Sequence, residues 1–122
     1  MKVMIVDDNE PMRRIIKSIV GDLAEELYEC QDGAEAVKLY GERRPDWVLM
    51  DLRMRGMDGL EAARRITASF PQARIVIVTD YDDAELREAA RRAGACWYIN
   101  KRRLSDLRPL LSPSSEPAGG AI

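Results

Sequence analysis

Histidine is absent from the 122 residues of this chain, and cysteine occurs only twice. Without an imidazole the chain cannot be a phosphohistidine carrier, use a Ser-His or Cys-His nucleophile system, or hold a metal through histidine. Cys30 and Cys96 lie far apart without CxxC spacing, and both flank predicted strands. We therefore expect two reduced core thiols in a cytoplasmic protein.

Long hydrophobic runs and a strong net charge are also missing. No apolar stretch approaches the roughly 20 residues that a membrane helix needs, and no signal-peptide cleavage pattern follows the N-terminus. The net charge of -2 gives no reason to expect binding to nucleic acid in bulk or to acidic membranes. Hydrophobic residues make up 46% and charged residues 33%, which is typical of one globular domain with a single core.

Short apolar runs alternate with helical periodicity along the chain. The runs predict strands over 3–6, 26–30, 47–50, 74–79 and 96–100, and helices are expected over about 10–23, 33–43, 59–70, 82–93 and 106–111. Asn9 and Ser105 are expected to cap helices, Asp58-Gly59 to start one and Gly94 to end one. Five such units predict an α/β fold with a parallel, doubly wound sheet and helices on both faces.

The helical periodicity also predicts which side chains face the core. The expected inward positions, in chain order, are Met12, Ile15, Ile16, Ile19, Val20, Leu23, Ala34, Val37, Tyr40, Leu60, Ala63, Ile66, Phe70, Leu86, Ala89, Ala90, Ala93, Leu107, Leu110 and Leu111.

Polar side chains follow four of the predicted strands at the point where each ends. Asp7 and Asp8 follow the first strand, Asp51 the third, Thr79 ends the fourth and Lys101 follows the fifth. Ligands of open α/β sheets bind at this carboxyl edge. Three carboxylates, a hydroxyl and an ammonium group together predict a site for a hard divalent cation and a phosphoryl group.

Each of these residues has an ordinary interpretation when it is taken alone. An acidic pair can be a solvated turn, a threonine often ends a strand, and a lysine beside Arg102 and Arg103 is usually a surface charge. Only the joint order of the residues makes the functional interpretation the stronger one.

The order and spacing of these residues resemble the receiver domain of two-component response regulators. The resemblance covers about residues 2–111 and depends on three segments, 51–59, 78–81 and 94–101. It implies a flavodoxin-like (βα)5 fold with strand order 2-1-3-4-5. The segment 80–83, and the lack of a proline after Lys101, are similar to the branch that carries a C-terminal helix-turn-helix output domain.

The resemblance implies a role for each site residue. Asp51 would accept a phosphoryl group from a sensor histidine kinase or a phosphotransfer protein. Asp8 would bind Mg²⁺ (or Mn²⁺) directly, with Asp7 nearby or acting through water, and Asp51 and the backbone carbonyl of Arg53 would complete the ligands. Thr79 would donate a hydrogen bond to the phosphoryl group, and Lys101 would pair with it.

The resemblance also implies that the chain is a phosphorylation-activated switch and not a metabolic enzyme. Such a switch catalyses only the capture and the loss of its own phosphoryl group. Tyr98 would turn inward on activation and fill the space that Thr79 vacates. The face formed by the fourth helix, fifth strand and fifth helix is the usual place for output or dimer contact. Its arginines form either a solvated basic face or such a contact surface: Arg87, Arg91, Arg92, Arg102, Arg103 and Arg108.

Residues 1–111 are expected to form the receiver domain. The Ser/Pro/Gly-rich segment 112–122 is expected to be a disordered tail or the start of an interdomain linker. Two alternatives follow for the output: a stand-alone receiver that acts by protein contact, or the excised receiver of a DNA-binding transcription regulator.

Several positions depart from the common family pattern, among them Trp97 and Arg102, and two of them lie close to the site. Arg55 stands where proline is usual, which should loosen the loop after Asp51, and Asp80 places an extra acid where a small residue is usual. If these changes disable phosphorylation, the chain would be a phosphorylation-independent interaction module. We also hypothesise that Arg53 and Tyr81, at the mouth of the site, tune the access of water to phosphorylated Asp51.

Two other protein classes on similar sheets fit the sequence poorly. An aspartyl-phosphate phosphatase needs a second acid two positions after its nucleophile, where this chain has Arg53. A flavin-binding module needs a phosphate loop of serine, threonine or glycine after the first strand, where residues 7–10 would repel phosphate.

Overall fold

The computed structural model describes residues 1–81, 83–112 and 122. The strands β1 (Lys2–Val6), β2 (Glu26–Cys30), β3 (Trp47–Met50), β4 (Ile75–Thr79) and β5 (Trp97–Asn100) form one parallel sheet in the order β2-β1-β3-β4-β5. The helices are α1 (Glu10–Val20), α2 (Gly33–Arg43), α3 (Gly59–Ser69), α4 (Ala84–Arg92) and α5 (Leu107–Leu111), with 3-10 turns η1 (Gly21–Leu23) and η2 (Lys101–Asp106). The predicted fold and strand order are confirmed.

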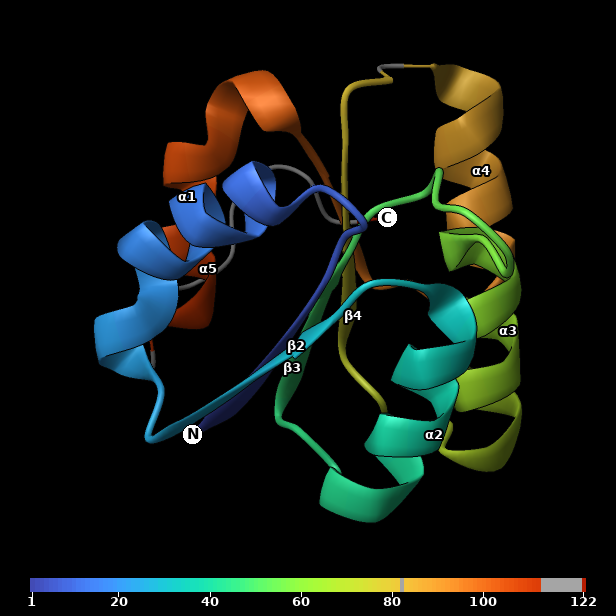
Figure 1. Cartoon of the computed structure of the whole chain (residues 1–122). Helices are drawn as coiled ribbons and strands as arrows, with labels where there is room; N and C mark the ends of the chain where they lie inside the picture. The colour runs from blue at the N-terminus through green and yellow to red at the C-terminus, as the bar shows by residue number, and fades with distance from the viewer. Residues whose placement is uncertain (82, 113–121) are drawn as a thin grey trace.

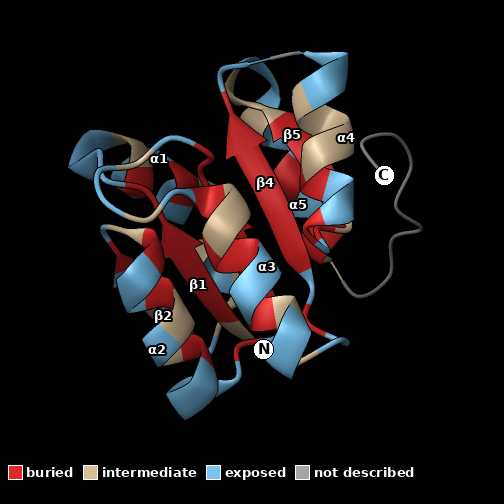
Figure 2. Cartoon of the chain, turned by 90° about the vertical axis from the view of Figure 1, so that its right-hand side faces the viewer, coloured by how far each residue is buried: buried red, intermediate tan, exposed pale blue. Residues whose placement is uncertain are grey.

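Helices cover both faces of the sheet (Figure 1). Helices α1 and α5 lie on one face, and α2, α3 and α4 lie on the other. The central strands β1, β3 and β4 are buried almost throughout, as Figure 2 shows for β1 and β4. Because both faces are covered, these strands are continuous apolar runs without alternation, which is why the sequence marks them so clearly.

Local side-chain hydrogen bonds fix where the helices begin and end. The side chains of Asn9, Asp32, Asp58 and Asp83 each accept a hydrogen bond from a backbone N–H in the first turn of α1, α2, α3 and α4. At the end of α4, Gly94 adopts a φ of 102° and its N–H donates to the Arg91 carbonyl at 3.0 Å. This is the αL stop that the sequence predicts.

Two predictions about inward helix positions are wrong. Ala34 is exposed, and Ala36 occupies the core in its place, four residues before Tyr40. Ile15 is 47% exposed, because α1 turns Arg13, Ile16 and Val20 toward the sheet.

Ser105 does not cap α5, because the chain leaves β5 through the 3-10 turn η2. The cap of that turn is Asn100, whose side chain accepts from the Arg102 N–H at 2.8 Å. The fourth helix starts at Ala84, and the expected start at Asp82 lies outside the described residues, as does most of the predicted tail, 113–121.

Both cysteines are free, with Cys30 buried and Cys96 half-buried, as predicted. Among the described residues, no helix has both the length and the apolar character needed to cross a membrane.

A substitution at Gly59 tests how closely α3 is packed under the site. A Cβ atom there would lie 2.1 Å from the Asp51 carbonyl oxygen, whereas nothing lies within 4 Å of a Cβ placed at Gly41 in α2. We expect Gly59→Ala to lower the free energy of unfolding by roughly 1–3 kcal/mol. The control Gly41→Ala should raise it by about 0.5–1 kcal/mol. Urea denaturation measures both, and equal effects would contradict the close approach.

Candidate functional site

Strand register brings the predicted site residues to one edge of the sheet. Val6 lies opposite Met50, and the Asp51 N–H donates to the Val6 carbonyl at 2.9 Å, so Asp7 and Asp51 leave their strands side by side. Thr79 lies opposite Asn100 in the β4–β5 ladder, so Lys101 follows immediately beyond Thr79.

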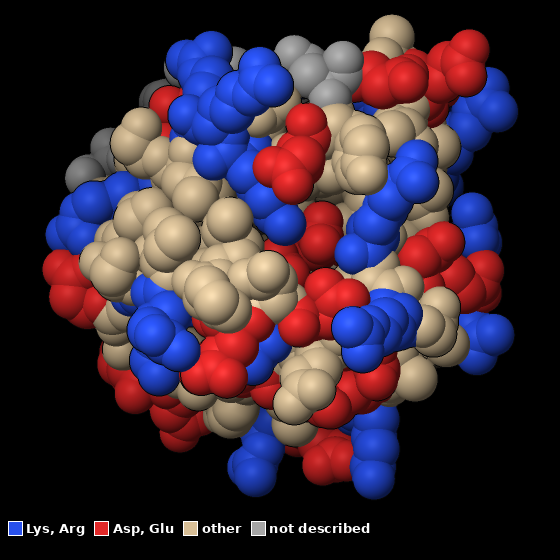
Figure 3. Space-filling model, turned by 45° about the horizontal axis from the view of Figure 1, so that its top comes forward, with Lys and Arg blue, Asp and Glu red and all other residues tan. Residues whose placement is uncertain are grey.

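The three predicted acids form a cluster. One carboxylate oxygen from each of Asp7, Asp8 and Asp51 lies within 4.8 Å of the others. Asp7 and Asp51 are buried and Asp8 is exposed. Acidic side chains gather in the middle of this end of the molecule, with basic side chains around them (Figure 3). Carboxylates this close repel one another, so the cluster needs positive charge.

Lys101 supplies part of that charge from the end of β5. Its Nζ lies 2.9 Å from Asp7 Oδ2 and 3.4 Å from Asp51 Oδ2, and all three side chains are largely shielded from solvent. Burial opposes the charge of the ammonium group, but the close contact with Asp7 and the charge of Asp51 outweigh it and raise the pKa of Lys101. Lys101 therefore stays protonated at neutral pH.

One ammonium group does not neutralise three carboxylates. Burial raises the pKa of Asp51 to about 6, against the pull of Lys101 and with a further rise from the charge of Asp7. Asp7 Oδ2 is buried and makes no well-aligned hydrogen bond within the described residues, although Lys101 lies close enough for an ion pair. An under-coordinated carboxylate oxygen beside two other acids fits a hard divalent cation.

Asp8 is held by the loop that follows Asp51. The backbone N–H of Arg55 donates to Asp8 Oδ2 at 3.3 Å. A proline at this position has no N–H and could not form the bond. Arg55, which stands where proline is usual in the family, therefore connects the loop after Asp51 to Asp8.

Thr79 and two tyrosines line the β4 side of the site. Thr79 is fully buried, and its Oγ1 accepts from the Tyr81 N–H at 3.3 Å. Tyr98 is 2% exposed and points inward, where its hydroxyl donates to the Tyr81 carbonyl at 2.6 Å and Arg87 Cζ lies 5.1 Å from its ring. The Arg53 Cζ lies 4.4 Å from the Tyr81 ring, so these two side chains are in contact.

The structure thus brings together Asp7, Asp8, Asp51 and Lys101, with Thr79 at the end of the neighbouring strand. The ligand role of the Arg53 carbonyl stays a prediction. Asp80 is exposed, yet its charge contributes to the raised pKa of Lys101.

Arg13 is a supporting residue that the sequence analysis missed. It is 8% exposed, its Nη1 donates to the Asp7 carbonyl at 2.6 Å, and its Nε donates to Glu29 Oε1 at 3.0 Å. Lys17 binds the other oxygen of Glu29 at 3.3 Å. The sequence could have indicated this role, because Arg13 shares a helix face with Ile16 and Val20. A charged side chain on a buried face needs a hydrogen-bonding or oppositely charged partner.

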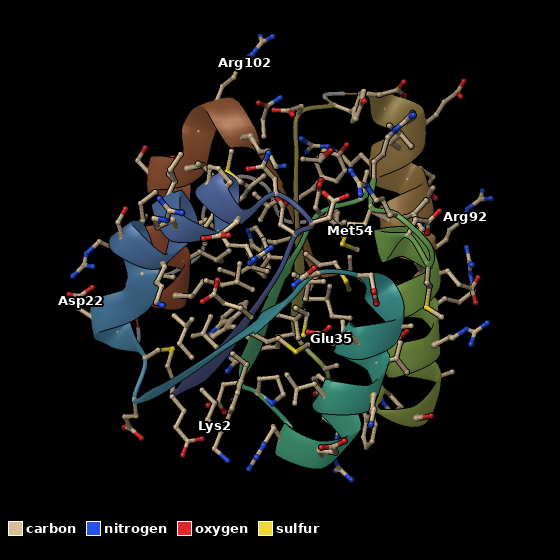
Figure 4. All side chains as sticks on the ribbon, viewed as in Figure 1. Lys2, Asp22, Glu35, Met54, Arg92 and Arg102 are labelled. Carbon is tan, nitrogen blue, oxygen red and sulfur yellow. The ribbon has the colours of Figure 1, made fainter. Side chains whose placement is uncertain are left out.

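Most of the arginines on the α4–β5–α5 face have acidic partners. Arg91 and Arg92 pair with Glu88, Arg103 pairs with Asp106, and both terminal nitrogens of Arg108 bind Asp22 on η1. Arg102 instead extends away from the body of the molecule (Figure 4). The face is therefore less basic than its sequence suggests.

Comparisons with known proteins agree with this geometry. The family model described as "Response regulator receiver domain" matches residues 3–111. The chemotaxis protein CheY of Halobacterium salinarum is 38% identical over 100 residues, which cover 82% of this chain and 83% of that protein. The uncharacterized transcriptional regulatory protein YhcZ of Bacillus subtilis is 36% identical over 89% of this chain, which spans only 50% of YhcZ.

Solved structures show the same relationship. A LuxR-family two-component response regulator from Aurantimonas superposes with a TM-score of 0.80 at 32% identity, covering 90% of this chain and 84% of that one. The response regulator domain of Thermotoga maritima CheB gives a TM-score of 0.77 at 29% identity over 91% and 90% of the two chains. This chain belongs to the receiver domains of two-component response regulators.

Proposed function

We propose that this chain acts in the cytoplasm, where Asp51 accepts a phosphoryl group from the phosphohistidine of a sensor histidine kinase or a phosphotransfer protein, with Mg²⁺ or Mn²⁺ bound. The observation that carries this proposal is the buried carboxylate of Asp51 beside Asp7, Asp8 and the Lys101 ammonium group. The chain then acts as a switch and not as a metabolic enzyme.

In the transfer, a carboxylate oxygen of Asp51 bonds to phosphorus as the phosphorus–nitrogen bond to the imidazole breaks, and the electron pair leaves with the nitrogen. Lys101 pairs with the added charge, and the Thr79 hydroxyl donates to a phosphoryl oxygen. Asp7, Asp8 and the Arg53 carbonyl would hold the cation, which supplies positive charge for a reaction that depends on positioning. Attack by water on phosphorus later restores the carboxylate and releases inorganic phosphate.

Phosphorylation adds about two negative charges at Asp51. Movement of Thr79 toward these charges would favour the inward orientation of Tyr98, whose hydroxyl bond to the Tyr81 carbonyl connects the site with the start of α4. The α4–β5–α5 face would then change shape as a two-state unit toward an output partner or a second copy of the chain. A stand-alone receiver that acts by protein contact fits the match over 83% of CheY, and the receiver part of a transcription regulator fits the match over 50% of YhcZ.

Replacing the acceptor tests the proposal directly. Wild-type protein treated with a small phosphoramidate should gain the mass of one phosphoryl group only when Mg²⁺ is present. Asp51→Asn should gain none, because it lacks the nucleophilic carboxylate. The control Asp106→Asn, at an exposed acid of η2, should behave as wild type in intact-mass spectrometry. If the wild type gains no mass under any condition, the chain is a phosphorylation-independent interaction module.

Arg13 provides a test of the metal site that does not depend on phosphorylation. Arg13→Gln removes the bond to the Asp7 carbonyl and should weaken Mg²⁺ binding by roughly 10-fold or more, as is usual when a ligand loses its support. Arg14→Gln is the matched control, because Arg14 is 71% exposed and bonds only to Glu10 among the described residues. Isothermal titration calorimetry measures both affinities, and equal values would contradict a positioning role.

The contact between Arg53 and Tyr81 should limit the access of water to phosphorylated Asp51. Arg53→Ala and Tyr81→Ala are therefore expected to speed loss of the phosphoryl group several-fold, and the double variant should add little, because the two side chains act as a pair. Arg64→Ala, at an exposed position of α3, is the control. The decay of phosphorylated protein after removal of the donor gives the rates, and unchanged rates would show that the pair does not act on water.

A further inference from the structure

A cavity of about 230 Å³ lies at the amino edge of the sheet, away from the acidic cluster. The end of α2, the entry to β3 and the α3–β4 connection surround it, and Tyr40, Arg44, Phe70 and Arg74 are among its lining residues. The Lys2 N–H donates to Asp46 Oδ2 beside the cavity at 2.7 Å. Lys2 marks this end of the molecule in Figure 4, opposite Arg102 and Met54.

Two arginines of the cavity are held in the same way. Arg44 Cζ lies 4.0 Å from the Phe70 ring centroid, and its Nε donates to the Gly41 carbonyl at 3.3 Å. Arg74 Cζ lies 4.3 Å from the Trp47 ring, and its Nε donates to the Asp46 carbonyl at 3.1 Å. Ring packing and the Nε bond orient each guanidinium while its two terminal nitrogens stay available as donors.

The charge of these arginines is not neutralised by a direct ion pair. In the described part of the chain, neither guanidinium pairs with a carboxylate, in contrast to Arg91 or Arg108. Asp46 is the acid of the lining, and its Oδ2 is already bound by the Lys2 N–H. Burial raises the pKa of the Tyr40 hydroxyl, and the positive charges of Arg44 and Arg74 act against that rise. The electrostatic field of each arginine therefore reaches the Tyr40 hydroxyl, which is a third hydrogen-bond donor in the cavity.

Arg44 occupies a backbone conformation that favours glycine. It is the C-cap of α2, with φ 48° and ψ 58°, and among the described residues it is the one non-glycine residue with a positive φ. An arginine in the αL region costs more than a glycine would. Residues held against such strain concentrate at functional sites, which points to a use for this side chain.

We propose that the cavity binds a small oxyanion, carrying a phosphate or carboxylate group, between Arg44 and Arg74. The fork of a guanidinium matches the oxygens of either group, and the fixed orientation of both arginines reduces the ordering that binding requires. The volume admits a ligand of only a few heavy atoms, below the usual range for larger cofactors. Binding here is separate from phosphoryl transfer at Asp51.

Trp47, 6% exposed beneath Arg74, is a built-in reporter for this site. The other tryptophan of the chain, Trp97, is removed by Trp97→Phe in every protein used. Each protein is titrated with sodium phosphate or with sodium acetate in buffer free of divalent cations, and sodium chloride holds the ionic strength constant. We expect a saturable change in Trp47 fluorescence with at least one of the two anions, and the comparison between them separates phosphate from carboxylate recognition.

Variants at the two arginines decide whether the signal comes from the cavity. Arg44→Gly removes a guanidinium at a position whose backbone favours glycine, so its thermal midpoint should not fall while its anion affinity drops at least 10-fold. Arg74→Gln should weaken the affinity to a similar extent. Arg43→Gln is the control, because Arg43 lies over Tyr28 and outside the cavity lining. The proposal is overturned if neither anion gives a saturable change, or if Arg44→Gly and Arg74→Gln both keep the wild-type affinity.

Discussion

The convergence of two buried carboxylates on one ammonium group is the constraint on which the rest of this molecule depends. Asp7 and Asp51 are buried at the ends of adjacent central strands, and Lys101 reaches both from the edge strand. A buried acid pair without that lysine would be strongly unfavourable. The sheet register, the burial of β1 and β3 and the short turn after β5 all serve to keep these charges in contact.

The surroundings of the cluster follow from the need to hold these charges. Arg13 fixes the backbone of Asp7 from beneath, and the Arg55 amide fixes the carboxylate of Asp8 from the loop. Gly59 lets α3 begin against the Asp51 carbonyl, where a methyl group has no room. Each contact restrains a different acid, so the geometry of the cluster does not depend on a single loop.

Much of this arrangement could be predicted from the sequence, because it depends on short-range patterns. Buried parallel strands are continuous apolar runs, and the residue after each run must lie at the carboxyl edge, so Asp7, Asp51 and Lys101 could be placed without a structure. The confirmed caps, Asn9 and Gly94, satisfy backbone groups of neighbouring residues and are local in the same sense.

The features that sequence reasoning missed depend on contacts between distant segments. The pattern of α1 places Arg13 on the buried face, but its partner Glu29 lies on β2 and is brought to it only by the fold. Ser105 is a good cap by type, but the 3-10 turn from β5 moves the start of α5 beyond it. The cavity at the amino edge is lined by residues from the ends of α2 and α3 and from just before β3 and β4. Neither Arg44 nor Arg74 belongs to a recognisable sequence motif.

The inward position of Tyr98 has a thermodynamic consequence. Its hydroxyl donates a hydrogen bond to the Tyr81 carbonyl, and a bond of this kind contributes a net stabilisation of about 1 kcal/mol. At room temperature that energy raises the population of molecules with the bond formed, relative to those without it, by a factor of about five. This bond alone therefore favours the inward position of the ring by that factor, in addition to what its burial and its contact with Arg87 contribute.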